Sequence, residues 1–107
     1  MTDYIQVSTA IDSEEGAQKI AETLVSARLA ACVHVVGPIK STYWWQGQIE
    51  RAQEWVCIAK TRQALYQEVE QAIRALHPYE EPEIIATPIL TGSQGYLDWI
   101  AGETKKQ

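Results

Sequence analysis

The strand and helix patterns of the 107-residue sequence follow the order βαββαβ, with one short helix at the end. Residues 4–10 alternate polar and apolar side chains as a strand does, and two later stretches repeat apolar residues at helical spacing. Between those helices, Gln46-Gly47 separates two long extended segments, as the loop of a β-hairpin does. This order predicts an α+β, ferredoxin-like fold in which both helices cover one face of a four-stranded antiparallel sheet. We expect a single domain over residues 1–107.

Local signals set the predicted boundaries. Asp12-Ser13 suits the N-cap of the first helix, and Pro78 ends the second helix at His77, because the residue before a proline avoids the helical region. Gly37-Pro38 interrupts the second strand as a bulge or bend. The predicted strands cover residues 4–10, 29–36 with an extension from 39 to 45, 48–61 and 83–87. The predicted helices cover residues 12–27, a second stretch that begins at 62 or 63 and ends at 77, and residues 96–101.

The four strands differ in their expected surroundings. The strand at residues 29–36 is apolar on both faces, and the strand at 83–87 is expected to be mostly buried. Pro88 indicates that this last strand ends there or lies on an edge of the sheet. The polar tail at residues 102–107 is expected to fray.

The two-residue loop at Gln46-Gly47 predicts that Cys57 lies opposite Val36. With Val33, Val35, Val56 and Ile58 facing the helices, the open face of the sheet then carries Cys32, His34, Val36, Trp55 and Cys57. Such an apolar face is typical of an interface, so the sequence predicts an oligomer.

The two cysteines are expected to be free thiols. In the predicted register Cys32 lies about 13 Å along the strand from Cys57, whereas a disulfide needs Cα atoms within about 7 Å. Free thiols are typical of the reducing cytoplasm. Cys32 and His34 on one face suit copper or zinc, and a buried small side chain beside a packed histidine explains the same pair.

Composition excludes some partners. The formal net charge is -5, so the chain lacks the basic surface that nucleic acid or an anionic membrane attracts. No apolar stretch approaches the about 20 residues of a membrane span, and residues 1–12 lack the pattern of a signal peptide.

Residues 77–83, His-Pro-Tyr-Glu-Glu-Pro-Glu, form a stiff turn that holds an imidazole, a phenol and three carboxylates. His77 lies at a helix C-terminus, where the helix dipole favours its charged form. Together with Glu80 or Glu83 it would suit a borderline divalent cation such as copper(II) or zinc. A helix end followed by a solvated acidic turn uses the same residue types. A hydrolase with His77 and Glu80 as acid and base is a further alternative, although no catalytic motif is present.

Several motifs together resemble the CutA divalent-cation tolerance family. They extend from about residue 4 to residue 101, and the turn at 77–83 is the most specific of them. The matching stretches are Leu29-Ala30-Ala31-Cys32-Val33, Ser41-x-Tyr43-Trp44-Trp45-x-Gly47, Lys60-Thr61, His77-Pro78-Tyr79-Glu80-x-Pro82-Glu83 and Tyr96-Leu97-x-Trp99-Ile100.

The resemblance implies a tight homotrimer in the cytoplasm, related to copper and other divalent cations, with no organic cofactor and no enzymatic activity. It places Cys32 on the family's strand cysteine, whereas His34 stands where a smaller polar residue such as asparagine is expected. The residues expected to bind metal are Cys32, His77, Glu80 and Glu83, and a ligand cleft between subunits is expected to include Lys60, Tyr79 and Trp45. The alternative is a trimeric small-molecule sensor that binds an anionic metabolite near Lys60 and Arg62.

Overall fold

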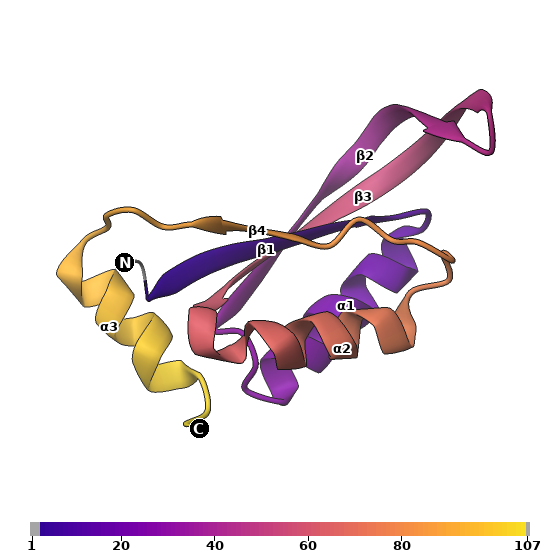
Figure 1. The fold of residues 1–107 in the computed structure, drawn as a ribbon. Coiled ribbons are helices and arrows are strands. Elements are labelled where there is room, and N and C mark those ends of the chain that lie inside the picture. Colours follow the sequence, from indigo (N-terminus) through magenta and orange to yellow (C-terminus); the bar gives the residue numbers. More distant parts are fainter. Residues whose placement is uncertain (1–2, 107) are drawn as a thin grey trace.

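The computed structural model describes residues 3–106 and contains one antiparallel sheet with the strand order β2-β3-β1-β4. Helices α1 and α2 cover one face of this sheet, and α3 lies at the opposite end from the turn after α2 (Figure 1). The predicted ferredoxin-like α+β fold is therefore confirmed. The elements are β1 (Tyr4–Ile11), α1 (Glu14–Ser26), β2 (Cys32–Trp45), β3 (Gln48–Arg62), the 3-10 turn η1 (Gln63–Leu65), α2 (Tyr66–Leu76), β4 (Ile85–Pro88) and α3 (Gln94–Glu103).

Both ends of α1 follow from local chemistry. The Ser13 side chain accepts a 3.0 Å hydrogen bond from the first turn, which confirms the predicted cap. At the other end Arg28 adopts a left-handed conformation with φ 61°, and the Leu29 amide donates to the Leu24 carbonyl. This C-terminal motif turns the chain back toward the core. The second strand consequently begins at Cys32, later than predicted.

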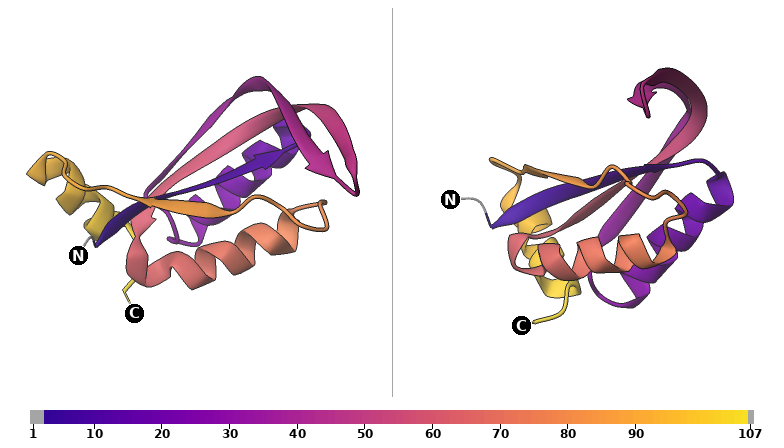
Figure 2. Two further views of the ribbon diagram at one scale, coloured as in Figure 1. Left: turned by 45° about the horizontal axis from the view of Figure 1, so that its top comes forward. Right: turned by 45° about the vertical axis from the view of Figure 1, so that its right-hand side comes forward.

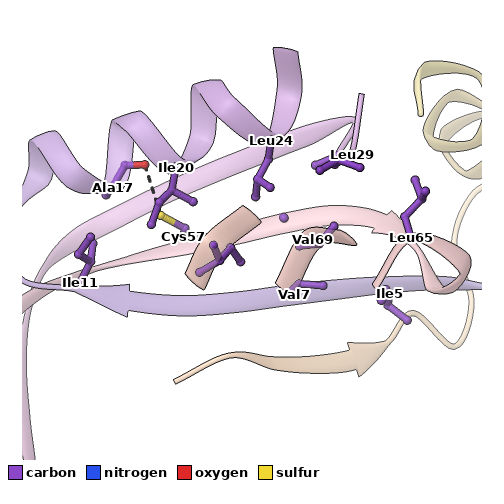
Figure 3. Packing of buried hydrophobic residues seen from close by; sticks show 13 residues of the cluster. Ile5, Val7, Ile11, Ala17, Ile20, Leu24, Leu29, Cys57, Leu65 and Val69 are labelled. Atoms are coloured by element: carbon purple, nitrogen blue, oxygen red, sulfur yellow. Dashed lines mark hydrogen bonds between the residues drawn. The ribbon is translucent and has the colours of Figure 1, made fainter. Parts of the chain in front are cut away.

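The core lies between the sheet and the two helices (Figure 3). Cys57 is 1% exposed, and its thiol donates a 3.5 Å hydrogen bond to the Ala17 carbonyl of α1. Both cysteines are free, as predicted. The buried cluster consists of Ile5, Val7, Ile11, Ala17, Ile20, Leu24, Leu29, Ala30, Cys57, Ala59, Leu65, Val69 and Ile73.

The β2–β3 hairpin extends well beyond the helices (Figure 1). Its loop is the predicted pair, since Gln46 and Gly47 have φ values of 51° and 81° and join the paired residues Trp45 and Gln48. A bulge between Val36 and Ile39 then shifts the register. We call residues 39–54, the part of the hairpin beyond the bulge, the arm.

The bulge reverses part of the predicted face assignment. Cys57 pairs with Val35, not with Val36, and therefore points into the core. Trp55 also packs against the core, so the prediction that Trp55 and Cys57 lie on the open face was wrong. Val56 and Ile58, which alternate with them, lie on the open face instead. The open face still carries Cys32, His34 and Val36, because Val33 and Val35 pack against the core as predicted.

The last strand and the tail also differ from expectation. β4 forms one edge of the sheet, as Pro88 indicated, and all four of its residues are exposed rather than buried. α3 extends to Glu103, and the chain after it is held down: Thr104 is 3% exposed and the Lys105 amide donates a 2.8 Å hydrogen bond to Arg28. The prediction of a frayed tail was therefore wrong up to Lys105, and residue 107 lies outside the described residues.

None of the helices formed by residues 3–106 combines the length and the apolar character that a bilayer crossing requires.

Candidate functional site

A cleft of about 730 Å³ lies where the arm, the end of β1 and the turn after α2 meet. The arm bends away from the helix layer, so its inner side faces back toward the sheet (Figure 2). Aromatic and acidic side chains predominate in the walls. The lining residues are Ala10, Ser41, Thr42, Tyr43, Trp44, Trp45, Glu54, Tyr79, Glu81 and Glu83.

The bulge decides which arm residues face the cleft. Beyond it Ile39 pairs with Glu54, and the ladder continues to the pair Trp45 and Gln48. Because side chains alternate along a strand, every second residue from Ile39 to Trp45 lies on the same face as Glu54. Tyr43 and Trp45 are two of these residues, which brings their rings to the side of the sheet where Glu54 lies.

His77 holds the turn in place. It is the C-cap of α2, as Pro78 predicted, and only 9% of the residue is exposed. Its Nε2 bonds the Ala10 carbonyl at 2.8 Å, while its Nδ1 accepts a 3.2 Å hydrogen bond from the Tyr79 amide. A ring that donates at Nε2 and accepts at Nδ1 is neutral, contrary to the charged form expected at a helix end. His77 thus ties the turn to the end of β1.

Tyr79 and Glu54 form the polar centre of the cleft. The Tyr79 hydroxyl donates a 2.7 Å hydrogen bond to Glu54 Oε2, and Glu54 is only 6% exposed. Burial, and secondly this carboxylate, raise the pKa of Tyr79 well above its ordinary value of 10.0. The other oxygen of Glu54, Oε1, has no hydrogen-bond donor among residues 3–106.

The expected cleft residues are partly brought together. Tyr79 and Trp45 line the cleft, and so does Glu83. Lys60 does not, because it lies farther along β3, where its Nζ is 3.1 Å from His34 Nδ1. The two cations expected to bind an anionic metabolite are both engaged elsewhere, since Arg62 donates to Thr104 and to the Lys105 carbonyl.

The four expected metal ligands lie in separate places. Cys32 is on the open sheet face opposite Lys60, and both nitrogens of His77 are hydrogen-bonded. Glu80 is exposed on the turn, and Glu83 lines the cleft. Across residues 3–106 no three His, Cys, Asp or Glu side chains are grouped to hold a metal ion. The metal role of these residues stays a prediction.

The sequence analysis assigned no cleft role to five residues that line it, namely Ser41, Tyr43, Trp44, Glu54 and Glu81. A glutamate directly before the apolar run that begins at Trp55 is a weak signal of burial. Glu54 could have been found only by asking which acceptor the Tyr79 hydroxyl reaches, and that needs the tertiary fold.

The sequence model of the CutA1 divalent ion tolerance protein family matches residues 5–103. The chain belongs to this family. The divalent-cation tolerance protein CutA of Thermus thermophilus is 44% identical to it over 94 residues, which cover 88% of this chain and 91% of the relative. The chloroplastic protein CutA 1 of Oryza sativa subsp. japonica is 36% identical over 102 residues, and the match spans 95% of this chain but only 58% of that relative.

Solved CutA structures share the fold. The crystal structure of CutA1 from Oryza sativa superposes with a TM-score of 0.95 at 35% identity and covers 99% of this chain and 97% of its own. The structure described as the periplasmic divalent cation tolerance protein CutA from Archaeoglobus fulgidus has a TM-score of 0.92 at 40% identity, covering 95% of this chain and 99% of its own. The CutA family therefore includes proteins described as chloroplastic and as periplasmic.

Proposed function

We propose that this chain is a cytoplasmic, non-enzymatic homotrimer of the CutA family that takes part in divalent cation tolerance. In this proposal it binds divalent ions, copper among them, weakly at clefts between subunits. The observation that supports the binding role is the cleft of this chain, whose lining includes the carboxylates of Glu54, Glu81 and Glu83. Within residues 3–106 these carboxylates are not grouped closely enough to hold an ion by themselves, so a neighbouring subunit or water would complete the site.

Exposed apolar residues support the assembly. Val36, Ile49 and Ile85 are 49%, 50% and 51% exposed, and Leu90 is 88% exposed. β2 and β4, the two outer strands of the sheet, also present unpaired backbone groups that another subunit could bond. Apolar surface of this kind is typical of an obligate interface. Light scattering at micromolar concentration should return three times the 12.0 kDa chain mass, and a monomer mass would contradict the proposal.

The surroundings of His77 support weak rather than tight metal binding. A metal ion at Nδ1 would have to replace the hydrogen bond from the Tyr79 amide, and one at Nε2 would leave the buried Ala10 carbonyl without its donor. Either loss reduces the net binding free energy by about 1–3 kcal/mol. Carboxylates of the turn, water or a second subunit would supply the remaining ligands.

Calorimetric titration of the assembled protein with copper(II) tests the site. We expect Glu83→Gln and His77→Ala to weaken binding, and Glu22→Gln, which alters an exposed glutamate of α1, to leave it unchanged. Affinity should fall as the pH is lowered, because imidazole and carboxylate ligands must be deprotonated to bind a metal ion. Equal affinity in all three variants would exclude the cleft as the copper site.

Cys32 requires a separate test. A thiolate favours copper(I), so Cys32→Ser should lower copper(I) affinity if the strand cysteine takes part. The two free thiols support a reducing compartment for this chain. Cell fractionation with an antibody to the native protein tests that location, and recovery outside the cytoplasm would contradict it.

A further inference from the structure

The cleft is larger than a metal ion needs. Its volume of about 730 Å³ falls in the range of about 300–1,000 Å³ that is typical of small-molecule sites. A bare divalent ion with oxygen ligands at 2–2.6 Å would leave most of it empty. The cleft is therefore large enough for a small organic ligand.

Glu54 defines the charge of that ligand. The side chain is buried, yet only one of its oxygens, Oε2, receives a hydrogen bond from Tyr79. A buried carboxylate is stable when its charge is paired and its lone pairs are bonded. Oε1 has no donor among residues 3–106 and is not enclosed by protein atoms, so it remains an accessible acceptor for a ligand N–H group.

The remaining lining residues exclude an anion and favour an apolar body. Within the part of the chain that the structure describes, neither lysine nor arginine lines the cleft, whereas Glu81 and Glu83 add negative charge. Tyr43 and Trp45 line the cleft together with Glu54 and are 41% and 40% exposed in the single chain. Aromatic faces attract cations and cover aliphatic chains, and the two effects act together on an alkylammonium ion.

We propose that this cleft binds a primary organic ammonium ion with an aliphatic tail. The ammonium group donates a hydrogen bond to Glu54 Oε1, and the tail packs on the rings of Tyr43 and Trp45. This inference deepens the proposed cation-binding role of the same cleft by naming an organic ligand class, and it does not require a metal ion to be bound.

Calorimetry on the assembled protein with n-pentylammonium chloride, in the presence of a chelator, tests the proposal. Two probes of equal length serve as controls: 1-pentanol lacks the charge, and pentanoate reverses it. We expect n-pentylammonium to bind at least about tenfold more tightly than either control, because only it gives a charge-assisted hydrogen bond. No binding, or equal binding of the ammonium ion and the alcohol, would overturn the proposal.

Variants locate the bound probe. Glu54→Gln should weaken n-pentylammonium at least about tenfold and should leave 1-pentanol unchanged, since it removes charge but little volume. Trp45→Leu should weaken n-pentylammonium at least about threefold and keeps the proposal testable if Glu54→Gln fails to fold. Glu22→Gln on α1 is the matched control and should bind as the parent does. Unchanged affinity in both cleft variants would place the probe elsewhere and refute the assignment.

The copper titration separates this proposal from the metal proposal. Binding of n-pentylammonium without any copper binding would support the organic site and contradict the metal site. Copper binding without n-pentylammonium binding would do the reverse.

Discussion

The Tyr79 hydroxyl and Glu54 Oε2 lie 2.7 Å apart and join the turn after α2 to strand β3. The two residues are 25 positions apart in the chain. Their bond orients a buried carboxylate that lines the cleft, so the stability of the fold and the proposed ligand binding should both depend on it.

Tyr79→Phe should lower the free energy of unfolding by about 1.5–3 kcal/mol, the usual contribution of a hydrogen bond to a charged group. Glu54 stays buried in the variant and loses its donor, which places the effect toward the upper end. Urea denaturation measures the change. Tyr43→Phe is the matched control, because the Tyr43 hydroxyl has no hydrogen-bond partner among residues 3–106, and equal losses in both variants would contradict the prediction.

Thr9 and Thr61 form a second matched pair, since both are fully buried strand residues. Thr61 Oγ1 donates a 2.6 Å hydrogen bond to the Leu29 carbonyl, whereas Thr9 Oγ1 has no partner in the described chain. Thr61→Val should destabilise the protein by about 1–3 kcal/mol, and Thr9→Val should be neutral or stabilise it by about 1 kcal/mol. Thermal unfolding with both variants tests this difference, and a destabilised Thr9→Val would show that its hydroxyl is satisfied.

Gly37→Ala tests the packing at the bulge. A Cβ on Gly37 would lie 2.5 Å from Trp55 Cδ1 and 3.1 Å from the Glu54 carbonyl oxygen. The Trp55 ring would have to move, at a cost of about 1–3 kcal/mol. Gly95→Ala in α3 meets no atom within 4 Å and should be neutral or stabilising, because alanine favours helices. Similar denaturation midpoints for Gly37→Ala and the parent would show that the bulge tolerates a side chain.

Because the Cys57 thiol is buried, we expect the folded protein to lose stability at alkaline pH. Burial raises the pKa of this thiol from 9.0 to about 11, so the folded chain keeps the thiol proton that the unfolded chain releases. The unfolded state therefore binds fewer protons above pH 9, and stability falls between pH 9 and 11 by up to about 1.4 kcal/mol per pH unit. Cys57→Ala should be less stable at pH 7, because it leaves a cavity, and should have a flatter profile from pH 9 upward. Parallel profiles would contradict the assignment to Cys57.

The sequence predicts the elements well where the signal is local. The Ser13 cap, the hairpin loop at Gln46-Gly47 and the helix end before Pro78 each depend on residues within a few positions, and each was confirmed. The interruption at Gly37-Pro38 was also recognised. Its effect on the register was not, because a bulge adds a residue to one strand without a partner in the other. That single shift moved Cys57 from the open face to the core.

The candidate site was harder to predict, because its contacts join distant parts of the chain. The residue types in the turn directed attention to Tyr79 and Glu83, which do line the cleft. Glu54 resembles a surface residue until the fold shows that it is buried under Tyr79. His77 has the chemistry of a metal ligand, but only the fold shows that its Nε2 bonds the Ala10 carbonyl, 67 residues away.

The arm contributes no side chain to the buried cluster, whose two members in the hairpin are Cys57 and Ala59 of β3, between the bulge and the end of that strand. A two-stranded ribbon without a core is marginally stable in water. In a lone chain the amide hydrogens of residues 39–54 should therefore exchange with solvent much faster than those of β1. If the proposed homotrimer covers the arm, the same amides should become protected, and their exchange rate would then report on assembly residue by residue. The time that a newly made chain spends with its arm exposed to solvent would then depend on the concentration of the protein.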